Sequence, residues 1–369
     1  MKPAPSIIGF TTASGLGYGM LFVLAAGALF GLIPSDRWLG ITGLLLALSS
    51  ITAGLFASTL HLGHPERAWR AISQWRSSWL SREGLLAILT YVPAVVFAYG
   101  WIIDETASGL YGVMAIIAAV GAAATVYCTG MIYASLPPIK AWHQPLTAPI
   151  YMALAFMTGL LAVHLLLILF GVPHLLVGLI TMLAIGCAFI LKTMYWRQTS
   201  DDRVEGPTVE SATGLKTSGL VRMLDPPHTQ TNYLMDEMGF QIGRKHARML
   251  RLLTYFFGMA VPLLLTLVTL TRDNWLTAIL ALFALASGMV GILLERWLFF
   301  AEAKHSVMLY YSGRQDVVGQ KAVSRAKSKS DAATASIVKP QRRRTAPTRR
   351  RANIRANGSE SDVDQPASI

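Results

Sequence analysis

The sequence predicts an all-α integral membrane protein, a bundle of eight transmembrane helices followed by a disordered basic tail. Two observations lead to this fold class. Only 14% of the 369 residues are charged, whereas soluble domains carry about 25%. The apolar residues also gather in runs of roughly 20, the length that crosses a hydrocarbon layer about 30 Å thick. Runs this long and continuous exclude barrel strands, and an open sheet cannot satisfy its backbone groups in lipid.

The apolar runs predict spans, in chain order, at 15–33, 39–60, 84–103, 110–134, 147–170, 174–195, 250–271 and 275–299. The first is rich in glycine and has neither a basic leading segment nor a small-residue cleavage site, so we expect it to be retained rather than removed as a signal peptide. The fifth and sixth are separated only by Gly171-Val172-Pro173. The other spans rest on the length and continuity of their apolar runs.

Lysine and arginine are concentrated in alternate loops. The connector 61–83 holds four arginines, loop 135–146 holds Lys140, and loop 197–248 holds seven basic residues. The opposite loops are nearly balanced, with Arg37 beside Asp36 and Arg272 beside Asp273. Because basic loops remain in the cytoplasm, we expect both termini there, in a multi-pass protein of the bacterial inner membrane.

The chain is expected to divide into an eight-helix membrane domain over 1–310, with the cytoplasmic loop 197–248, and a disordered basic tail over 311–369. Residues 313–369 hold 13 Lys and Arg against 5 Asp and Glu, with few apolar residues, a composition typical of disorder. Contact with anionic membrane lipids accounts for such a tail better than nucleic-acid binding, so no nucleic-acid partner is expected. Loop 197–248 is the predicted docking surface for a soluble partner.

The connector between the second and third spans holds the residue types that a proton-coupled reaction needs. His61 ends one span and Glu83 opens the next, at the same water–lipid boundary. Oxidation of a quinol releases two protons with its two electrons. An imidazole accepts a proton near neutral pH, and a carboxylate can serve as the second acceptor. Trp69, Trp75 and Trp79 offer flat apolar faces for a quinone ring.

The same connector also has an ordinary interpretation. Tryptophan and arginine at a membrane boundary form the usual aromatic belt, and basic loops orient the protein. Glu83 could act only as a helix cap near Ser81, where the helix dipole favours a carboxylate. From the residues alone, both interpretations stay open.

Three further ionisable residues draw attention inside the predicted spans. His164 lies roughly 25 Å from the cytoplasmic end of its span, too far to share a plane with His61. We therefore expect His164 to form an interhelical hydrogen bond rather than ligate haem. Glu295 and Arg296 are adjacent and point about 100° apart on a helix, so they do not form a simple pair. Arg296 either reaches towards the interface or belongs to a site.

The residues around the connector form a recognisable pattern. They are Leu60-His61-Leu62-Gly63, Pro65 and Arg67-Ala68, followed by Leu80-Ser81 and Glu83. This pattern resembles the membrane-anchor subunit family of the dimethyl sulfoxide reductases (DmsC type). The resemblance implies an eight-span anchor that oxidises quinol, menaquinol included, in anaerobic respiration. Electrons would pass to a four-cluster ferredoxin-like iron–sulfur subunit and then to a molybdopterin catalytic subunit.

The resemblance also implies site residues. The quinol-site histidine and glutamate of the family correspond to His61 and Glu83, and Arg67, Trp79 and Arg296 are further quinol-binding candidates. The chain would bind quinol as a diffusible substrate and hold no metal, haem or iron–sulfur cluster itself. Its two cysteines both fall inside predicted spans, whereas a cluster takes four.

Some features depart from the family pattern. Glu295 is displaced relative to the acidic residue that precedes the final-span arginine in the best-known members, which leaves its role open. Those members are usually drawn with their termini outside the cytoplasm, opposite to the orientation that the charges predict here. The terminal substrate therefore stays open.

Two rival function classes remain. A secondary transporter or membrane scaffold would use its basic loops only for orientation, although a transporter should show broken helices in matched positions, which this sequence does not predict. A polysulfide-reductase-type anchor would perform similar quinone chemistry with other residues. We predict a quinol-oxidising anchor subunit of a molybdopterin oxidoreductase, with reduction of the terminal substrate in partner subunits.

Overall fold

The computed structural model describes residues 1–60, 64–200, 214, 237–238, 246–270 and 274–310. Within these residues, eight helices are long and apolar enough to cross a membrane, as the apolar runs predict. Seven are α1 (Pro5–Leu29), α2 (Arg37–Thr59), α4 (Trp79–Ile102), α5 (Gly109–Ala134), α6 (Thr147–Leu169), α7 (Leu175–Ser200) and α13 (Trp275–Ala301). The eighth spanning helix is made of three consecutive pieces: α11 (Ala247–Tyr255), the short π-helix η2 (Phe256–Ala260) and α12 (Val261–Thr269). Three short pieces complete the described part: η1 (Pro65–Arg67), α3 (Trp69–Ile72) and η3 (Ser306–Tyr310).

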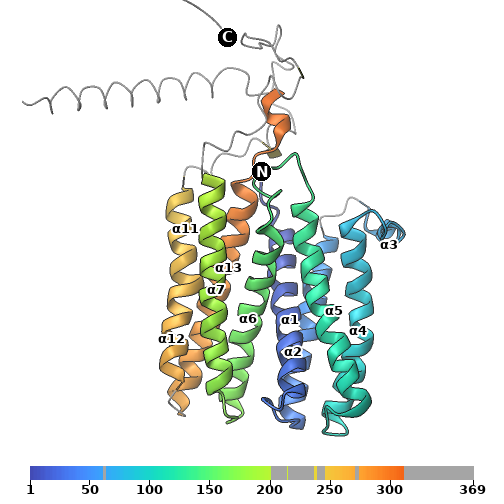
Figure 1. Ribbon diagram of the computed structural model, residues 1–369, viewed down its shortest axis with the longest axis vertical. Helices are drawn as coiled ribbons and strands as arrows, with labels where there is room; N and C mark the ends of the chain where they lie inside the picture. The colour runs from blue at the N-terminus through green and yellow to red at the C-terminus, as the bar shows by residue number, and fades with distance from the viewer. Residues whose placement is uncertain (61–63, 201–213, 215–236, 239–245, 271–273, 311–369) are drawn as a thin grey trace, which may run out of the picture. The chain divides into compact units, whose positions relative to one another are not determined.

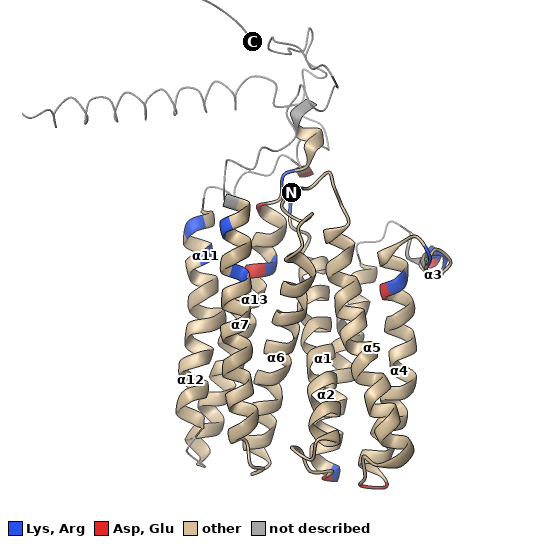
Figure 2. Ribbon diagram, in the orientation of Figure 1, with Lys and Arg blue, Asp and Glu red and all other residues tan. Residues whose placement is uncertain are grey.

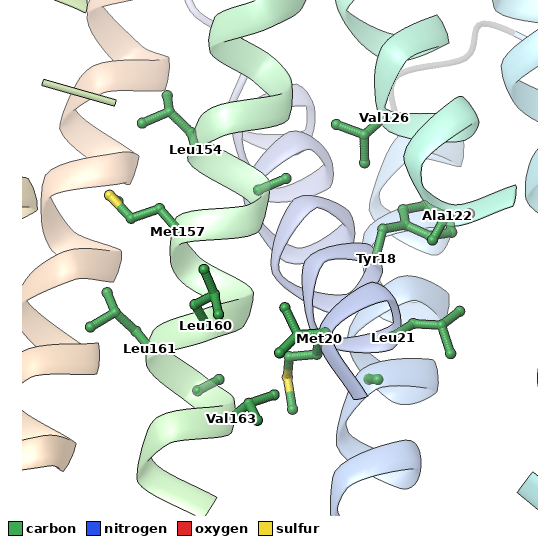
Figure 3. Close-up of a cluster of buried hydrophobic side chains, with 14 of the residues drawn as sticks. Tyr18, Met20, Leu21, Ala122, Val126, Leu154, Met157, Leu160, Leu161 and Val163 are labelled. Atoms are coloured by element: carbon green, nitrogen blue, oxygen red, sulfur yellow. The ribbon is translucent and has the colours of Figure 1, made fainter. Parts of the chain in front are cut away.

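Helices α1 and α6 lie at the centre of the bundle, with α2, α4 and α5 on one side and α7, α11, α12 and α13 on the other (Figure 1). Most of the apolar window of α6 is buried, against about a third of the windows of α7 and α13. Tyr18 and Leu21 of α1 belong to a core that also contains Val126 of α5 and Leu154 of α6 (Figure 3). Any polar group on the inner faces of these helices is therefore shielded from lipid.

Helix α1 begins ten residues before the predicted span because polar residues in its first turns lower the local hydropathy. Pro5 occupies the first turn, where its missing N–H leaves no bond unmade. Thr11 and Ser14 are buried, and their hydroxyls donate to the carbonyl oxygens of Ile7 and Phe10. Hydroxyl groups that donate a hydrogen bond to a carbonyl oxygen of their own helix can be buried without a partner on another helix.

Helices α1 and α6 pack backbone against backbone. A Cβ atom on Gly19 would overlap the carbonyl of Ala155, and one on Gly159 would overlap the backbone of Gly19. Small residues at such crossings let transmembrane helices approach closely. Gly258 of η2 meets Gly291 of α13 in the same way. The glycines at these crossings thus serve packing.

Most of the lysines and arginines among the described residues lie towards one end of the bundle (Figure 2). We call this the basic end; it carries the connector between α2 and α4, the loop between α5 and α6, the end of α7 and the start of α11. Arg37 and Glu105 pair at the opposite end, with 3.0 Å between Nη2 and Oε1. The predicted disordered tail 311–369 and most of the predicted docking loop 197–248 lie outside the described residues.

Candidate functional site

Glu83 lies inside the protein and does not cap its helix. The cap of α4 is Ser78, whose hydroxyl accepts a hydrogen bond from the Ser81 amide at 3.4 Å. Glu83 follows in the second turn and is 4% exposed. Its carboxylate accepts a hydrogen bond from the Thr129 hydroxyl of α5. The capping interpretation is therefore wrong, and Glu83 is a buried acid held between two helices.

The end of the connector is fixed to α4 by Arg82. Its guanidinium donates to the carbonyl oxygens of Trp75 at 2.9 Å and Arg76 at 2.7 Å. The same group lies 4.2 Å from the centre of the Trp79 ring, which meets Tyr127 edge to face at 6.0 Å. The contacts of Arg82 and Trp79 thus fix the start of α4, and Glu83 follows on the buried side of this helix.

The other residues predicted in the connector lie at its surface or outside the described part. His61 directly follows the C-cap Leu60 of α2 and is not among the described residues. The Arg67 side chain is exposed, with Nε 3.8 Å from the Glu66 carboxylate. Trp69 is 67% exposed. Among the described residues, no hydrogen bond or ion pair joins a connector side chain before Trp79 to Glu83.

A narrow polar pocket lies between α1, α5, α6 and α13, with room for about one water molecule. Its lining residues are Thr11, Thr12, Ser14, Gly15, Leu16, Val126, Thr129, Tyr151, Leu154, Ala155, Thr158, Ile292 and Arg296. Thr129, the hydrogen-bond partner of Glu83, belongs to the α5 wall, and Arg296 belongs to the α13 wall. Arg296 therefore lines the pocket itself, whereas Glu83 does not line it and reaches its wall only through the hydrogen bond from Thr129.

Arg296 does not reach towards the membrane interface. It is 2% exposed, and its guanidinium carbon lies 3.6 Å from the centre of the Tyr151 ring. Tyr133 stacks on Tyr151 at 5.6 Å, and Trp142 stacks on Phe299 at 5.5 Å. Because Phe299 lies one turn beyond Arg296 towards the basic end, these rings separate the guanidinium from water at that end.

The sequence interpretation missed Lys192, which lies in α7. Lys192 and Glu295 are fully buried, and the lysine Nζ donates to the Glu295 carboxylate. The ammonium also lies 4.2 Å from the Tyr195 ring centre and 4.7 Å from that of Trp196. The signal was available, since an ionisable residue inside an apolar run is a functional candidate by default. Glu295 pairs across helices with Lys192 and also contacts its neighbour Arg296, with 3.5 Å between Oε2 and Nε, so the three residues form a group rather than a simple pair.

Lys192, Glu295 and Arg296 form what we call the ion cluster, and the cluster lies at about the depth of Glu83. At 1.5 Å per residue, Glu83 is about 6 Å from the start of α4 and Glu295 is about 9 Å from the end of α13. Both of these helix ends belong to the basic end. The polar groups thus form a layer across the bundle rather than a path along it.

A second buried polar group lies towards the opposite end. His164 Nε2 is 2.9 Å from the Thr269 hydroxyl, which confirms the predicted interhelical hydrogen bond. His174, at the start of the next helix, has Nε2 3.0 Å from the Thr269 carbonyl oxygen, and the two imidazole rings are 5.4 Å apart. The sequence did not predict this pairing, because His174 falls at a span boundary.

Comparison with known proteins places the chain in a family. A family model described as the DMSO reductase anchor subunit (DmsC) matches residues 1–301. The C subunit of the sulfite dehydrogenase of Allochromatium vinosum is 32% identical over 341 residues, which cover 84% of this chain and 99% of that protein. The family match extends across all eight spans.

Proposed function

The chain belongs to the DMSO reductase anchor subunit family, and from this membership we propose that it exchanges electrons and protons with quinone at its basic end. The coarse function follows from the family itself. The protein is the multi-pass membrane anchor of a molybdoenzyme-type complex, which includes catalytic and electron-transfer partner subunits. The quinone chemistry, the site residues and the nature of the partners are our proposal.

One observation carries the proposal: Glu83 is a buried acid whose hydroxyl donor, Thr129, lines a small polar pocket together with Arg296. When a quinol loses two electrons it must also lose two protons. The Glu83 carboxylate would accept one, with Thr129 holding it in place, and His61 would accept the other. The Arg296 guanidinium would stabilise negative charge on the ring oxygens as the protons leave.

The partners are proposed to dock at the basic end. By the charge rule this end faces the cytoplasm, where an iron–sulfur subunit of the four-cluster ferredoxin type would accept electrons and pass them to a molybdopterin subunit. The chain has two cysteines, so the clusters would belong to the partner. Mass spectrometry of the complex purified in mild detergent checks this composition; recovery of the folded anchor without such subunits would contradict it.

The direction of electron flow has two candidates. A DMSO reductase-type complex would oxidise menaquinol or another quinol in anaerobic respiration. The relative from Allochromatium vinosum is instead named for a dehydrogenase, which removes electrons from its substrate. That name favours the reverse direction, in which two electrons and two protons convert quinone to quinol and the same residues supply protons.

The substitution Glu83→Gln tests the proposed site. Glutamine keeps the size of the side chain and an oxygen for the Thr129 hydrogen bond, but it cannot carry the proton. We expect quinone-linked turnover of the whole complex in membranes to fall about 10²-fold or more. The activity of the partner subunits with a soluble redox dye should stay at the wild-type level, which shows that assembly is intact.

The matched control is Glu105→Gln, at the exposed opposite end of the bundle. It should leave both activities unchanged. Full quinone-linked turnover in the Glu83→Gln complex would overturn the assignment of the site. Loss of both activities would indicate failed assembly. The test would then use Glu83→Asp, which keeps the carboxylate.

A further inference from the structure

The polar pocket is surrounded by buried polar atoms that form no hydrogen bond with the described residues. They are Arg296 Nε and Nη1 on α13, the Thr12 hydroxyl on α1 and the Tyr151 hydroxyl on α6. All three residues line the pocket, and each is at most 6% exposed. Three helices thus bring unbonded polar atoms to the walls of one small space.

Arg296 is the costliest of these residues to leave without hydrogen bonds. Its guanidinium is a cation with five N–H hydrogens, and its ion pair with Glu295, at 3.5 Å from Nε, is too poorly aligned to be a hydrogen bond. Tyr151 offers the guanidinium the face of its ring, 3.6 Å from the central carbon. Burial of an ion with unused donors is costly, so these N–H groups require a further partner.

The size of the pocket limits what this partner can be. The pocket has room for about one water molecule, which excludes a quinone ring, a lipid headgroup and an oxyanion as large as phosphate. Apolar side chains complete the wall, among them Val126 of α5 and Leu154 of α6 (Figure 3). The candidates are therefore a water molecule and a monatomic anion.

The other hydroxyl groups of the wall favour water over an anion. Thr11, Ser14 and Thr158 each donate their hydroxyl hydrogen to a carbonyl oxygen of their own helix, so only the lone pairs of these oxygens remain for a ligand. Lone pairs accept a hydrogen bond from water but repel an anion. The wall thus combines donors on Arg296 with acceptors on the hydroxyl groups, the combination that a water molecule uses.

We propose that the polar pocket is a binding site for one ordered water molecule. The water accepts a hydrogen bond from the Arg296 guanidinium and donates its two hydrogens to hydroxyl oxygens of α1 and α6, those of Thr12 and Tyr151 among them. Buried waters typically form about three such bonds. The water joins α13 to the two central helices of the bundle and holds the guanidinium in place. The site is independent of the role proposed for Glu83.

A density map of the whole complex, at a resolution that shows ordered water, tests the site directly. We expect one peak in the pocket, within hydrogen-bond distance of the Arg296 guanidinium and of the Thr12 or Tyr151 hydroxyl. A dry pocket would overturn the proposal. So would a peak that strengthens when bromide replaces chloride in the buffer, because bromide scatters more strongly and its uptake identifies an anion site.

The substitution Gly15→Ala tests whether the water stabilises the bundle. Gly15 lines the pocket, and a Cβ atom there would lie 3.7 Å from the Cβ of Ala155, another lining residue. This is an ordinary contact, so the methyl group enters the pocket without a clash and takes the place of the water. The melting temperature of the complex should fall by about 5 °C as buried donors lose their partner.

The matched control is Gly9→Ala, on the same helix and away from the pocket. A Cβ atom on Gly9 would lie 3.9 Å from the Cβ of Ala57, again an ordinary contact. Because alanine suits a helix better than glycine does, the melting temperature should stay the same or rise. Equal melting temperatures for Gly15→Ala and Gly9→Ala would contradict a stabilising water.

A second variant, Gly15→Ser, separates lost hydrogen bonds from crowding. Serine is larger than alanine, but its hydroxyl group enters the pocket and can take over the bonds of the water. We expect Gly15→Ser to recover about half or more of the melting temperature that Gly15→Ala loses. A lower melting temperature for serine than for alanine would assign the loss to crowding and overturn the stabilising role. The map of the wild-type complex tests the site itself even if Gly15→Ala does not accumulate.

Discussion

The two ends of the bundle bury ionisable residues in different ways. Towards the opposite end, His164 and His174 share the backbone and side chain of Thr269 and join α6, α7 and α12. At the basic end, Lys192, Glu295 and Arg296 pair with one another, Glu295 and Arg296 leave hydrogen-bonding atoms unused among the described residues, and Arg296 lines a pocket. His164 Nδ1 is itself buried without a hydrogen bond among the described residues, but leaving a neutral ring atom unsatisfied costs less than leaving a buried ion unsatisfied. Neither burial nor an unmade bond therefore distinguishes the two ends; the difference is that one buries imidazole rings and the other buries paired ions.

Removing one member of the ion cluster should have the largest effect. Glu295→Ala leaves the Lys192 and Arg296 cations buried without their carboxylate, and we expect the free energy of unfolding to fall by about 3–5 kcal/mol. Thermal denaturation of the detergent-solubilised complex measures the change. Adding Lys192→Met should recover much of the loss by removing one of the two cations. No recovery in the double variant would mean that the two side chains do not act as a pair.

Removing the hydroxyl that holds Glu83 should have an intermediate effect. Thr129→Val keeps the shape of the side chain and removes the hydrogen bond to the carboxylate. A hydrogen bond to a charged group is worth about 1.5–3 kcal/mol, so quinone-linked turnover should fall about tenfold or more while dye activity is retained. Thr90→Val is the control, because the Thr90 hydroxyl donates to the Leu86 carbonyl on its own helix, α4. Equal loss in both variants would point to helix packing rather than to Glu83.

The smallest effect is expected at the opposite end. His164→Gln should lower the free energy of unfolding by about 1 kcal/mol, the net value of one hydrogen bond. Quinone-linked turnover should be unchanged at any stability that permits assembly. The same denaturation and turnover assays apply. A turnover defect in well-assembled His164→Gln complex would break the contrast between the two ends and give the histidines a part in the chemistry.

The sequence predicts the helices better than it predicts the relations between them. Apolar runs place the spans because lipid imposes their length. The start of α1 was missed because Thr11 and Ser14 bond to their own backbone, which hydropathy does not record. Glu83 was singled out because its carboxylate follows a distinctive connector; the structure shows that it is buried and bonded to Thr129, and its role at a quinone site stays a prediction. His61, the other half of that prediction, lies outside the described residues and stays a prediction.

The polar pocket could not be predicted, because its walls come from four helices that are distant in the sequence. Lys192 was passed over in the last turns of an apolar run, where a lysine usually extends to the interface. In the structure its ammonium is held inside by Glu295 and by aromatic rings of α7. The adjacency of Glu295 and Arg296 gave no hint of this partner, because Lys192 belongs to another helix and meets them only in the folded bundle.

The central position of α1 also has a consequence for biosynthesis. Helix α1 is the first to leave the ribosome, yet its closest backbone contact, at Gly19, is with α6, which begins at Thr147. At a synthesis rate of about 5–20 residues per second, α1 waits on the order of ten seconds for that partner. During this time Thr12 and the Tyr18 hydroxyl, buried in the finished protein, meet lipid or the insertion machinery instead. In the order of translation α1 can therefore pack first only against α2, which begins at Arg37, and its inner polar residues meet their remaining neighbours once α6 is inserted.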